Sequence, residues 1–249
     1  MENSSNITSR PVIYLLKKIA IPASTGSLFQ TLFNIVDTFF AGQISSDALA
    51  ALAKSFPLYF LIISAGIGIV AGCNSLISNS LGQRNRFAAL IYSHHTFIYS
   101  ILLSIIITTL GVLFSYDILK LMGSSSESII LAKKYTDIIF YGTVFFLILT
   151  SLNAILYSQG DTKTYRNVLI VGLFANILLN PIFIFGFLFI PAFGVAGIGY
   201  ATLIAQFLSL IIVLIKLLKN KRIKEIAIQN FKIKLFYIKN IFFQSMPIT

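Results

Sequence analysis

Long apolar runs separated by short charged segments dominate the pattern of this chain. A helix needs about 20 mostly apolar residues to cross the hydrocarbon core of a membrane, and the lack of water there favours helices, whose backbone groups are satisfied internally. The 49 uncharged residues between Arg166 and Lys216 are enough for two helices, with a turn predicted at Pro191 and Gly194. The pattern predicts six membrane-spanning helices, at residues 12–41, 51–80, 88–115, 130–158, 167–189 and 196–217.

The basic residues predict how these helices are oriented. Cytoplasmic loops carry an excess of Lys and Arg. An inside amino terminus places 15 of the 19 basic residues in the cytoplasm and leaves four outside: Lys54, Lys120, Lys133 and Lys134. Residues 1–11 are then a cytoplasmic tail. Residues 218–235 form a basic connector, which either lies on anionic lipid or is a solvated linker. Because the chain turns apolar again, 236–249 is expected to be the truncated start of a seventh helix, and the chain a fragment.

Composition supports a membrane protein and excludes other classes. Only 11% of the residues are charged and the mean hydropathy is +0.88, whereas a soluble domain carries about 25% charged residues. The fold class is therefore all-α, a polytopic membrane protein with a six-helix bundle over 12–217. The net charge of +11 does not indicate nucleic-acid binding, because the basic residues lie at the ends of apolar runs. The sequence contains no nucleotide-binding loop, metalloprotease motif or nucleophile elbow, so no enzyme activity is expected.

Asp37 is the acidic residue clearly embedded in an apolar run. A carboxylate inside the membrane is energetically costly, and such residues commonly mark ion or substrate pathways. Ser27, Gln30, Asn34 and Asp37 are spaced 3-4-3, which places them on one helical face. This polar stripe predicts an ion or proton site facing a cavity, although a structural contact between helices remains an alternative.

Two later helices carry weaker polar patterns. Asn176 and Asn180 are one turn apart and directly precede Pro181, which has no N–H and leaves an upstream carbonyl free. Interhelical hydrogen bonding alone could also explain these residues. Further polar residues lie at helical spacing on the sixth helix (Thr202, Gln206 and Ser209) and on the fourth (Thr150, Asn153 and Tyr157).

Pro22 lies fifteen residues before Asp37, and a proline kink there would act as a hinge that lets the helix bend as Asp37 changes its charge. His94 and His95 are expected at the membrane interface. As neighbours they point about 100° apart, so they cannot form an i, i+4 metal pair.

The order of several short motifs resembles the multidrug and toxic compound extrusion (MATE) family. The motifs are Ile21-Pro22 before Gln30-x3-Asn34-x2-Asp37-x4-Gly42, then Leu81-Gly82-Gln83-Arg84-Asn85, Gln159-Gly160-Asp161-Thr162-Lys163-Thr164, Asn176-x3-Asn180-Pro181 and Gly199-x-Ala201-Thr202.

The resemblance implies one lobe of a two-lobe, twelve-helix transporter in the plasma membrane, with the carboxy-terminal lobe missing here. Such a transporter exports amphipathic, often cationic organic compounds in exchange for Na⁺ or H⁺ and needs no other cofactor. Asp37 would be the coupling carboxylate. Where some prokaryotic members have a second carboxylate, this chain has Asn180. A Na⁺ site at Asp37, Asn176, Asn180 and Thr202 remains open, with Asn34 nearby and Gln30, Gln206 and Tyr157 in a polar cavity. Two alternatives are a lipid-linked oligosaccharide flippase of related architecture and a non-transporting truncated remnant.

Overall fold

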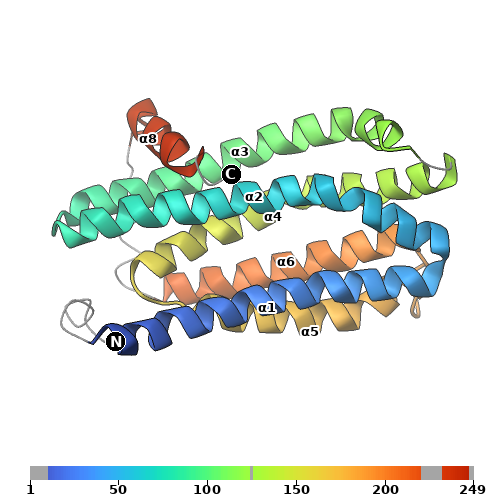
Figure 1. Cartoon of the computed structure of the whole chain (residues 1–249), viewed down its shortest axis with the longest axis horizontal. Helices are drawn as coiled ribbons and strands as arrows, with labels where there is room; N and C mark the ends of the chain where they lie inside the picture. Colours follow the sequence, from blue (N-terminus) through green and yellow to red (C-terminus); the bar gives the residue numbers. More distant parts are fainter. Residues whose placement is uncertain (1–10, 124–125, 220–231, 247–249) are drawn as a thin grey trace.

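The computed structural model describes residues 11–123, 126–219 and 232–246, and these form a bundle of long antiparallel helices (Figure 1). The connector 218–235 and the tail 1–11 fall mostly outside the described residues. The helices are α1 (Val12–Ile44), α2 (Ser46–Gly82), α3 (Arg86–Leu121), α4 (Ser126–Ser158), α5 (Lys163–Phe185), α6 (Val195–Leu218) and the short α8 (Leu235–Ser245).

Most helices extend beyond the predicted spans, and in α2 and α3 a side-chain cap starts the helix outside the apolar run. Ser45 accepts a hydrogen bond from the N–H of Ala48 (3.0 Å), so α2 begins five residues before the predicted 51. Asn85 caps α3 in the same way through the N–H of Ala88 (3.0 Å). The predicted fifth span, 167–189, is wrong at its end. Gly186, with φ of 81°, terminates α5 at Phe185.

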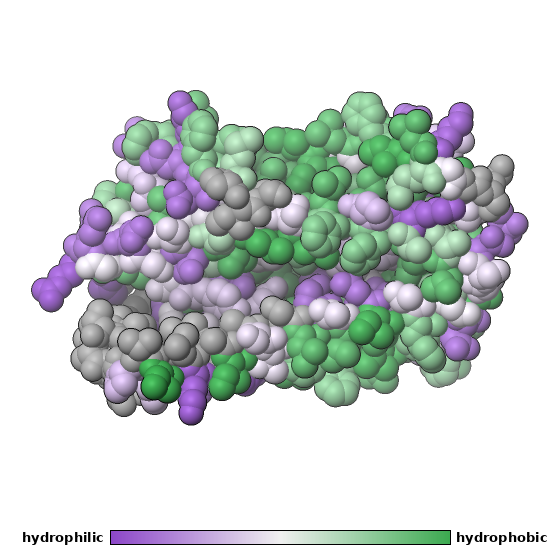
Figure 2. All heavy atoms as spheres, in the orientation of Figure 1, coloured by the Kyte–Doolittle hydropathy of each residue, from purple (hydrophilic) through white to green (hydrophobic). Residues whose placement is uncertain are grey.

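Five of the described helices, α2 to α6, are long and apolar enough to cross a membrane. With 33 residues α1 is also long enough to cross a membrane, and it carries Gln30, Asn34 and Asp37 among its apolar residues. Hydrophobic residues cover much of the visible surface, and hydrophilic residues gather mainly toward its two ends (Figure 2). This distribution fits a multi-pass membrane protein.

Helix α4 lies at the centre of the bundle and packs against α2, α3 and α6, while α1 packs on α5 and α5 on α6 (Figure 1). Small residues allow close packing at α4. A Cβ added to Gly66 of α2 would lie 2.7 Å from the ring of Phe146. Phe140, Leu147 and Leu149 of α4 are almost fully buried. The side of the bundle formed by α1, α5 and α6 is joined to α4 through α6.

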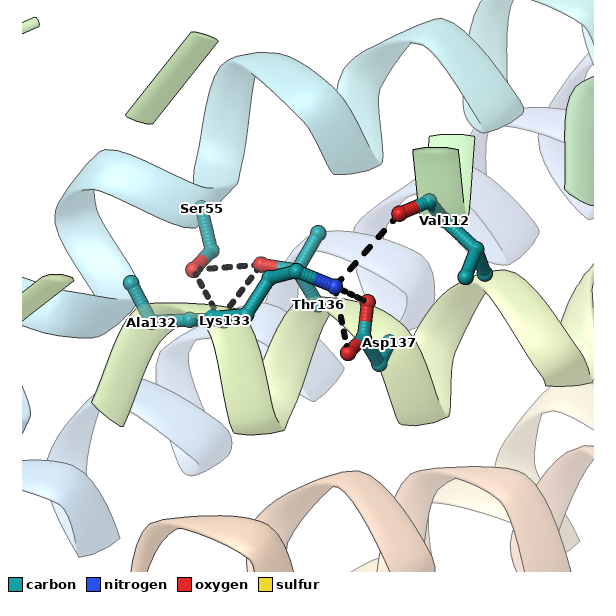
Figure 3. Close-up of polar contacts among 6 residues, drawn as sticks. All are labelled: Ser55, Val112, Ala132, Lys133, Thr136 and Asp137. Carbon is teal, nitrogen blue, oxygen red and sulfur yellow. Dashed lines mark hydrogen bonds and ion pairs between the residues drawn. The ribbon is translucent and has the colours of Figure 1, made fainter. Parts of the chain in front are cut away.

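We call the two ends of the bundle the basic end, at the turns α2–α3 and α4–α5, and the opposite end. Two polar contacts tie α4 to its neighbours toward the opposite end (Figure 3). Thr136 donates to Ser55 of α2 (3.1 Å). Lys133 pairs with Asp137 (2.5 Å) and reaches the carbonyl of Val112 on α3 (3.5 Å). Lys133 lies in α4, as the predicted span 130–158 implies, and near the opposite end of the bundle.

Helix α8 begins one residue before the predicted range 236–249, ends within it, and packs on α2 and α3 (Figure 1). The Nε2 atom of His95 accepts a hydrogen bond from the backbone N–H of Lys234 (3.1 Å). Ile241 is fully buried, and a Cβ on Gly72 would lie 2.8 Å from the backbone N of Ser245. His95 is almost fully buried, and the ring of Tyr237 on α8 packs against it (5.0 Å between centroids).

Candidate ion site and cavity

Asp37 lies between three helices and is 4% exposed. Its Oδ1 atom accepts hydrogen bonds from the amides of Asn176 (2.9 Å) and Asn180 (3.0 Å) on α5. Its Oδ2 atom accepts one from the hydroxyl of Thr202 on α6 (2.8 Å). The one-turn spacing of the asparagines places both on the face of α5 that meets α1. The structure thus brings together four residues that are far apart in the sequence.

These hydrogen-bond partners of Asp37 are all neutral. They orient the carboxylate but supply no positive charge, although an isolated buried charge is energetically costly. Asn180 also donates to Oδ1 of Asn176 (3.1 Å), and its own Oδ1 is buried without a hydrogen-bond partner in the described part of the chain. Carboxylate, hydroxyl and amide oxygens are the ligand types that hard cations prefer. One carboxylate can balance a single positive charge.

A large cavity of about 1090 Å³ lies on the other side of α1. Its walls are mostly apolar and come from α1, α2, α4 and the start of α5. Gln30 and Asn34 line it on α1, and Asn153 and Tyr157 on α4. The Nε2 atom of Gln30 and the Oδ1 atom of Asn153 are buried with no hydrogen-bond partner among the described residues. A donor and an acceptor are therefore available to a bound molecule.

The predicted polar stripe on α1 divides between these two places. Asp37 is buried toward α5 and α6, whereas Gln30 and Asn34 lie in the cavity wall. Asn34 takes part in none of the described hydrogen bonds of Asp37; instead, its carbonyl accepts from Thr38 (2.8 Å). Pro22 lies within α1. The side chains of Pro22 and Ser27 fall outside the described residues.

Gln206 does not reach the large cavity. It lines a small cavity of about 20 Å³ together with Thr202 and Tyr59, a volume about sufficient for one water molecule. Sequence reasoning missed other residues of the large cavity. Only helical spacing with Asn34 could have indicated those on α1, which are Thr31, Thr38 and Gln43, and no spacing could have indicated Tyr165 on α5.

No three His, Cys, Asp or Glu side chains come together as a metal site within the described ranges. Any cation at Asp37 would therefore be held mainly by neutral oxygens. Carboxylate, amide and hydroxyl oxygens are the ligands that hard cations prefer, whereas thiolates select soft metals.

Comparison with known proteins gives a consistent result. The MatE family model matches residues 22–182. The chain is 32% identical over 217 residues to a protein of Bacillus subtilis described as the probable multidrug resistance protein YoeA, covering 86% of this chain and 46% of that protein. It is 27% identical over 210 residues to the FAD transporter of Shewanella oneidensis, covering 84% of this chain and 46% of that protein.

A solved structure with the same arrangement is an outward-facing multidrug resistance MATE family transporter of the MOP superfamily. It superimposes with a TM-score of 0.83 at 27% identity, over 93% of this chain and 52% of that one. The chain spans about half the length of the relatives it matches.

Proposed function

Because this chain belongs to the MatE family, we propose that it forms the amino-terminal lobe of a transporter that exports amphipathic organic compounds in exchange for Na⁺ or H⁺. The family consists of transporters. The descriptions of the relatives as multidrug resistance proteins and an FAD transporter favour organic compounds over lipid-linked oligosaccharides as substrates. The proposal places the protein in the plasma membrane, with its amino terminus and basic end in the cytoplasm.

The single observation that carries the proposal is the environment of Asp37. This carboxylate is buried between α1, α5 and α6, and neutral groups make its described hydrogen bonds. A mobile cation or a proton would neutralise it at low energetic cost, and its release would leave the charge held by three donors. The site would therefore alternate between two states that differ by one charge, as cation coupling requires.

The asparagines support a role in both states. In the structure their amide nitrogens point at Asp37 and donate to it. If the Asn180 side chain rotated, its Oδ1 atom would face Asp37 in place of the amide nitrogen that now donates to it. In the described structure this oxygen has no hydrogen-bond partner. That oxygen could then ligate Na⁺ beside the carboxylate and the hydroxyl of Thr202, or accept a hydrogen bond from a protonated Asp37.

The large cavity suits the proposed substrates. A volume of about 1090 Å³ is slightly larger than the usual range for small-molecule pockets, about 300–1,000 Å³. Its mostly apolar wall would bind an organic ring system, and the free donor of Gln30 and acceptor of Asn153 would fix its orientation. Each buried polar group without a partner costs about 1–3 kcal/mol, which a suitable compound would recover. In the proposed transporter the second lobe completes this cavity.

Helix α1 would couple the ion to the substrate, since it lies between the two sites. One of its faces holds Asp37 against α5 and α6, and another lines the cavity with Gln30 and Asn34. A change in the hydrogen bonds at Asp37 would shift or bend α1 and so change the cavity wall. Pro22 is the proposed hinge of α1. If a Pro22→Ala variant transported with unchanged kinetics, Pro22 would have no role as a hinge.

The experiment is cation-driven efflux by the complete transporter in vesicles. An imposed inward Na⁺ gradient and an imposed proton gradient are compared for the export of a fluorescent cationic dye. We expect Asp37→Asn to abolish the response to the coupling ion, while Asp117→Asn, at an exposed position near the end of α3, leaves it intact. Export by Asp37→Asn that still follows the ion gradient at the wild-type rate would overturn the proposal.

A further inference from the structure

The turn between α5 and α6 exposes an unusual run of apolar side chains. Phe189 is 98% exposed and Leu188 82% exposed, and Phe185, Phe187 and Phe193 are exposed beside them. No charged residue occurs between Arg166 and Lys216, so the turn itself carries no charged side chain. In water such a cluster would be an unfavourable exposed patch.

Backbone groups of this turn form hydrogen bonds with one another and with the end of α5. Phe187 and Ile190 exchange two hydrogen bonds, N–H to O, of 3.0 and 2.9 Å. The N–H of Phe193 donates to Phe183 (2.9 Å), and that of Gly194 donates to Ile184 (3.2 Å). Pro191 has no N–H to satisfy. A turn with so many of its polar backbone groups paired can enter a medium poor in water, where unpaired groups are costly.

The lengths of the two helices place the turn at a membrane boundary. The uncharged part of α5, residues 167–185, rises about 28 Å at 1.5 Å per residue, and the uncharged part of α6, 195–215, rises about 31 Å. The hydrocarbon core is about 30 Å thick. With Arg166 and Lys216 at one interface, the turn therefore reaches the opposite one. In Figure 1 the α5–α6 connection stops short of the ends of α3 and α4.

The exposed cluster continues the lipid-facing surface of α5. Phe174, Leu178 and Phe185 are exposed at intervals of four and seven residues, on one side of the helix that leads into the turn. The ring of Phe193 packs edge-on against Tyr200 of α6 (5.2 Å between centroids), and Tyr200 is partly exposed. Tyr is typical of the membrane interface.

We propose that the turn 186–194 is a lipid anchor, which inserts Leu188 and Phe189 into the headgroup–acyl boundary of the leaflet opposite the basic end. Leu188 has a positive φ of 52°, which an L-residue with a side chain seldom adopts. The exposure of Leu188 and Phe189 shows that the tip of the turn projects from the bundle, and burial of these two side chains in lipid explains why both are apolar. The proposal rests on the membrane-spanning helices and not on the proposed transport activity.

The absence of tryptophan from the chain gives a direct test. Phe189→Trp introduces a single tryptophan, which can be excited selectively over the tyrosines. The protein is reconstituted in phosphatidylcholine vesicles that contain lipids brominated at the 6,7 or the 11,12 acyl positions. We expect strong quenching by the shallow 6,7-bromines, weaker quenching by the 11,12-bromines and several-fold weaker quenching by aqueous iodide than for an exposed tryptophan.

Two matched variants calibrate the measurement. Leu121→Trp, at an 87% exposed position beside Lys120 at the end of α3, should respond to iodide and not to brominated lipid. Leu178→Trp, on the lipid-facing side of α5, should be quenched most by the deeper bromines. Leu188→Trp repeats the test if Phe189→Trp fails to fold. The anchor is ruled out if tryptophan in the turn behaves like Leu121→Trp, or if neither iodide nor brominated lipid quenches it, which would mean that protein covers the turn.

Discussion

Replacing Thr202 with Val tests whether Thr202 stabilises the charge of Asp37. Val has nearly the same shape but cannot donate the 2.8 Å hydrogen bond to Oδ2 of Asp37. Because the acceptor is a buried carboxylate, this bond should contribute about 1.5–3 kcal/mol. For a domain of 150–250 residues, where 1 kcal/mol shifts Tm by about 2–4 °C, the loss corresponds to about 3–12 °C. Thr202→Ser keeps the hydroxyl and should stay close to wild type.

The assay is thermal unfolding of the detergent-solubilised protein, combined with a double-mutant cycle. In an Asp37→Asn background the acceptor is neutral, and Thr202→Val should cost only about 0.5–1.5 kcal/mol. The difference between the two costs measures the interaction with the charge. If Thr202 also ligates the coupling ion, Thr202→Val should weaken ion binding about tenfold for each 1.4 kcal/mol lost. An unchanged Tm, or an equal loss in Thr202→Ser, would refute the reasoning.

Two further variants test other parts of the structure. Asn180→Asp places a second carboxylate beside Asp37 in a buried site, so the ion-free protein should be less stable and Na⁺ should raise its Tm more than that of wild type; a Tm that Na⁺ does not affect would contradict the assignment of the site. His95→Leu removes the acceptor for the N–H of Lys234, a loss of about 1 kcal/mol, and should release α8 so that limited proteolysis cuts next to it more rapidly, whereas His94→Leu should not. Equal cleavage rates for the two histidine variants would show that the hydrogen bond does not hold α8.

The candidate site could be predicted only in part from the sequence. Asp37 was identified because a carboxylate within an apolar run is costly and therefore informative. Asn176 and Asn180 share a helix face through their spacing, but the spacing does not say which helix they meet. The division of the α1 stripe was not predicted, because helical periodicity places Gln30, Asn34 and Asp37 on one face without showing where one neighbouring helix ends and the cavity begins.

By itself the sequence determined the class of the fold and the approximate positions of its long helices. The lipid interior has no water to form hydrogen bonds with the backbone N–H and C=O groups. Long apolar runs therefore form helices, in which these groups bond to one another. Only the tertiary structure decided which side chains meet. The bond from Thr202 to Asp37 joins residues 165 positions apart, and the bond from Lys234 to His95 joins residues 139 apart. Such contacts depend on how helices of similar composition pack, and that choice arises from side-chain shapes and paired polar groups across the whole bundle.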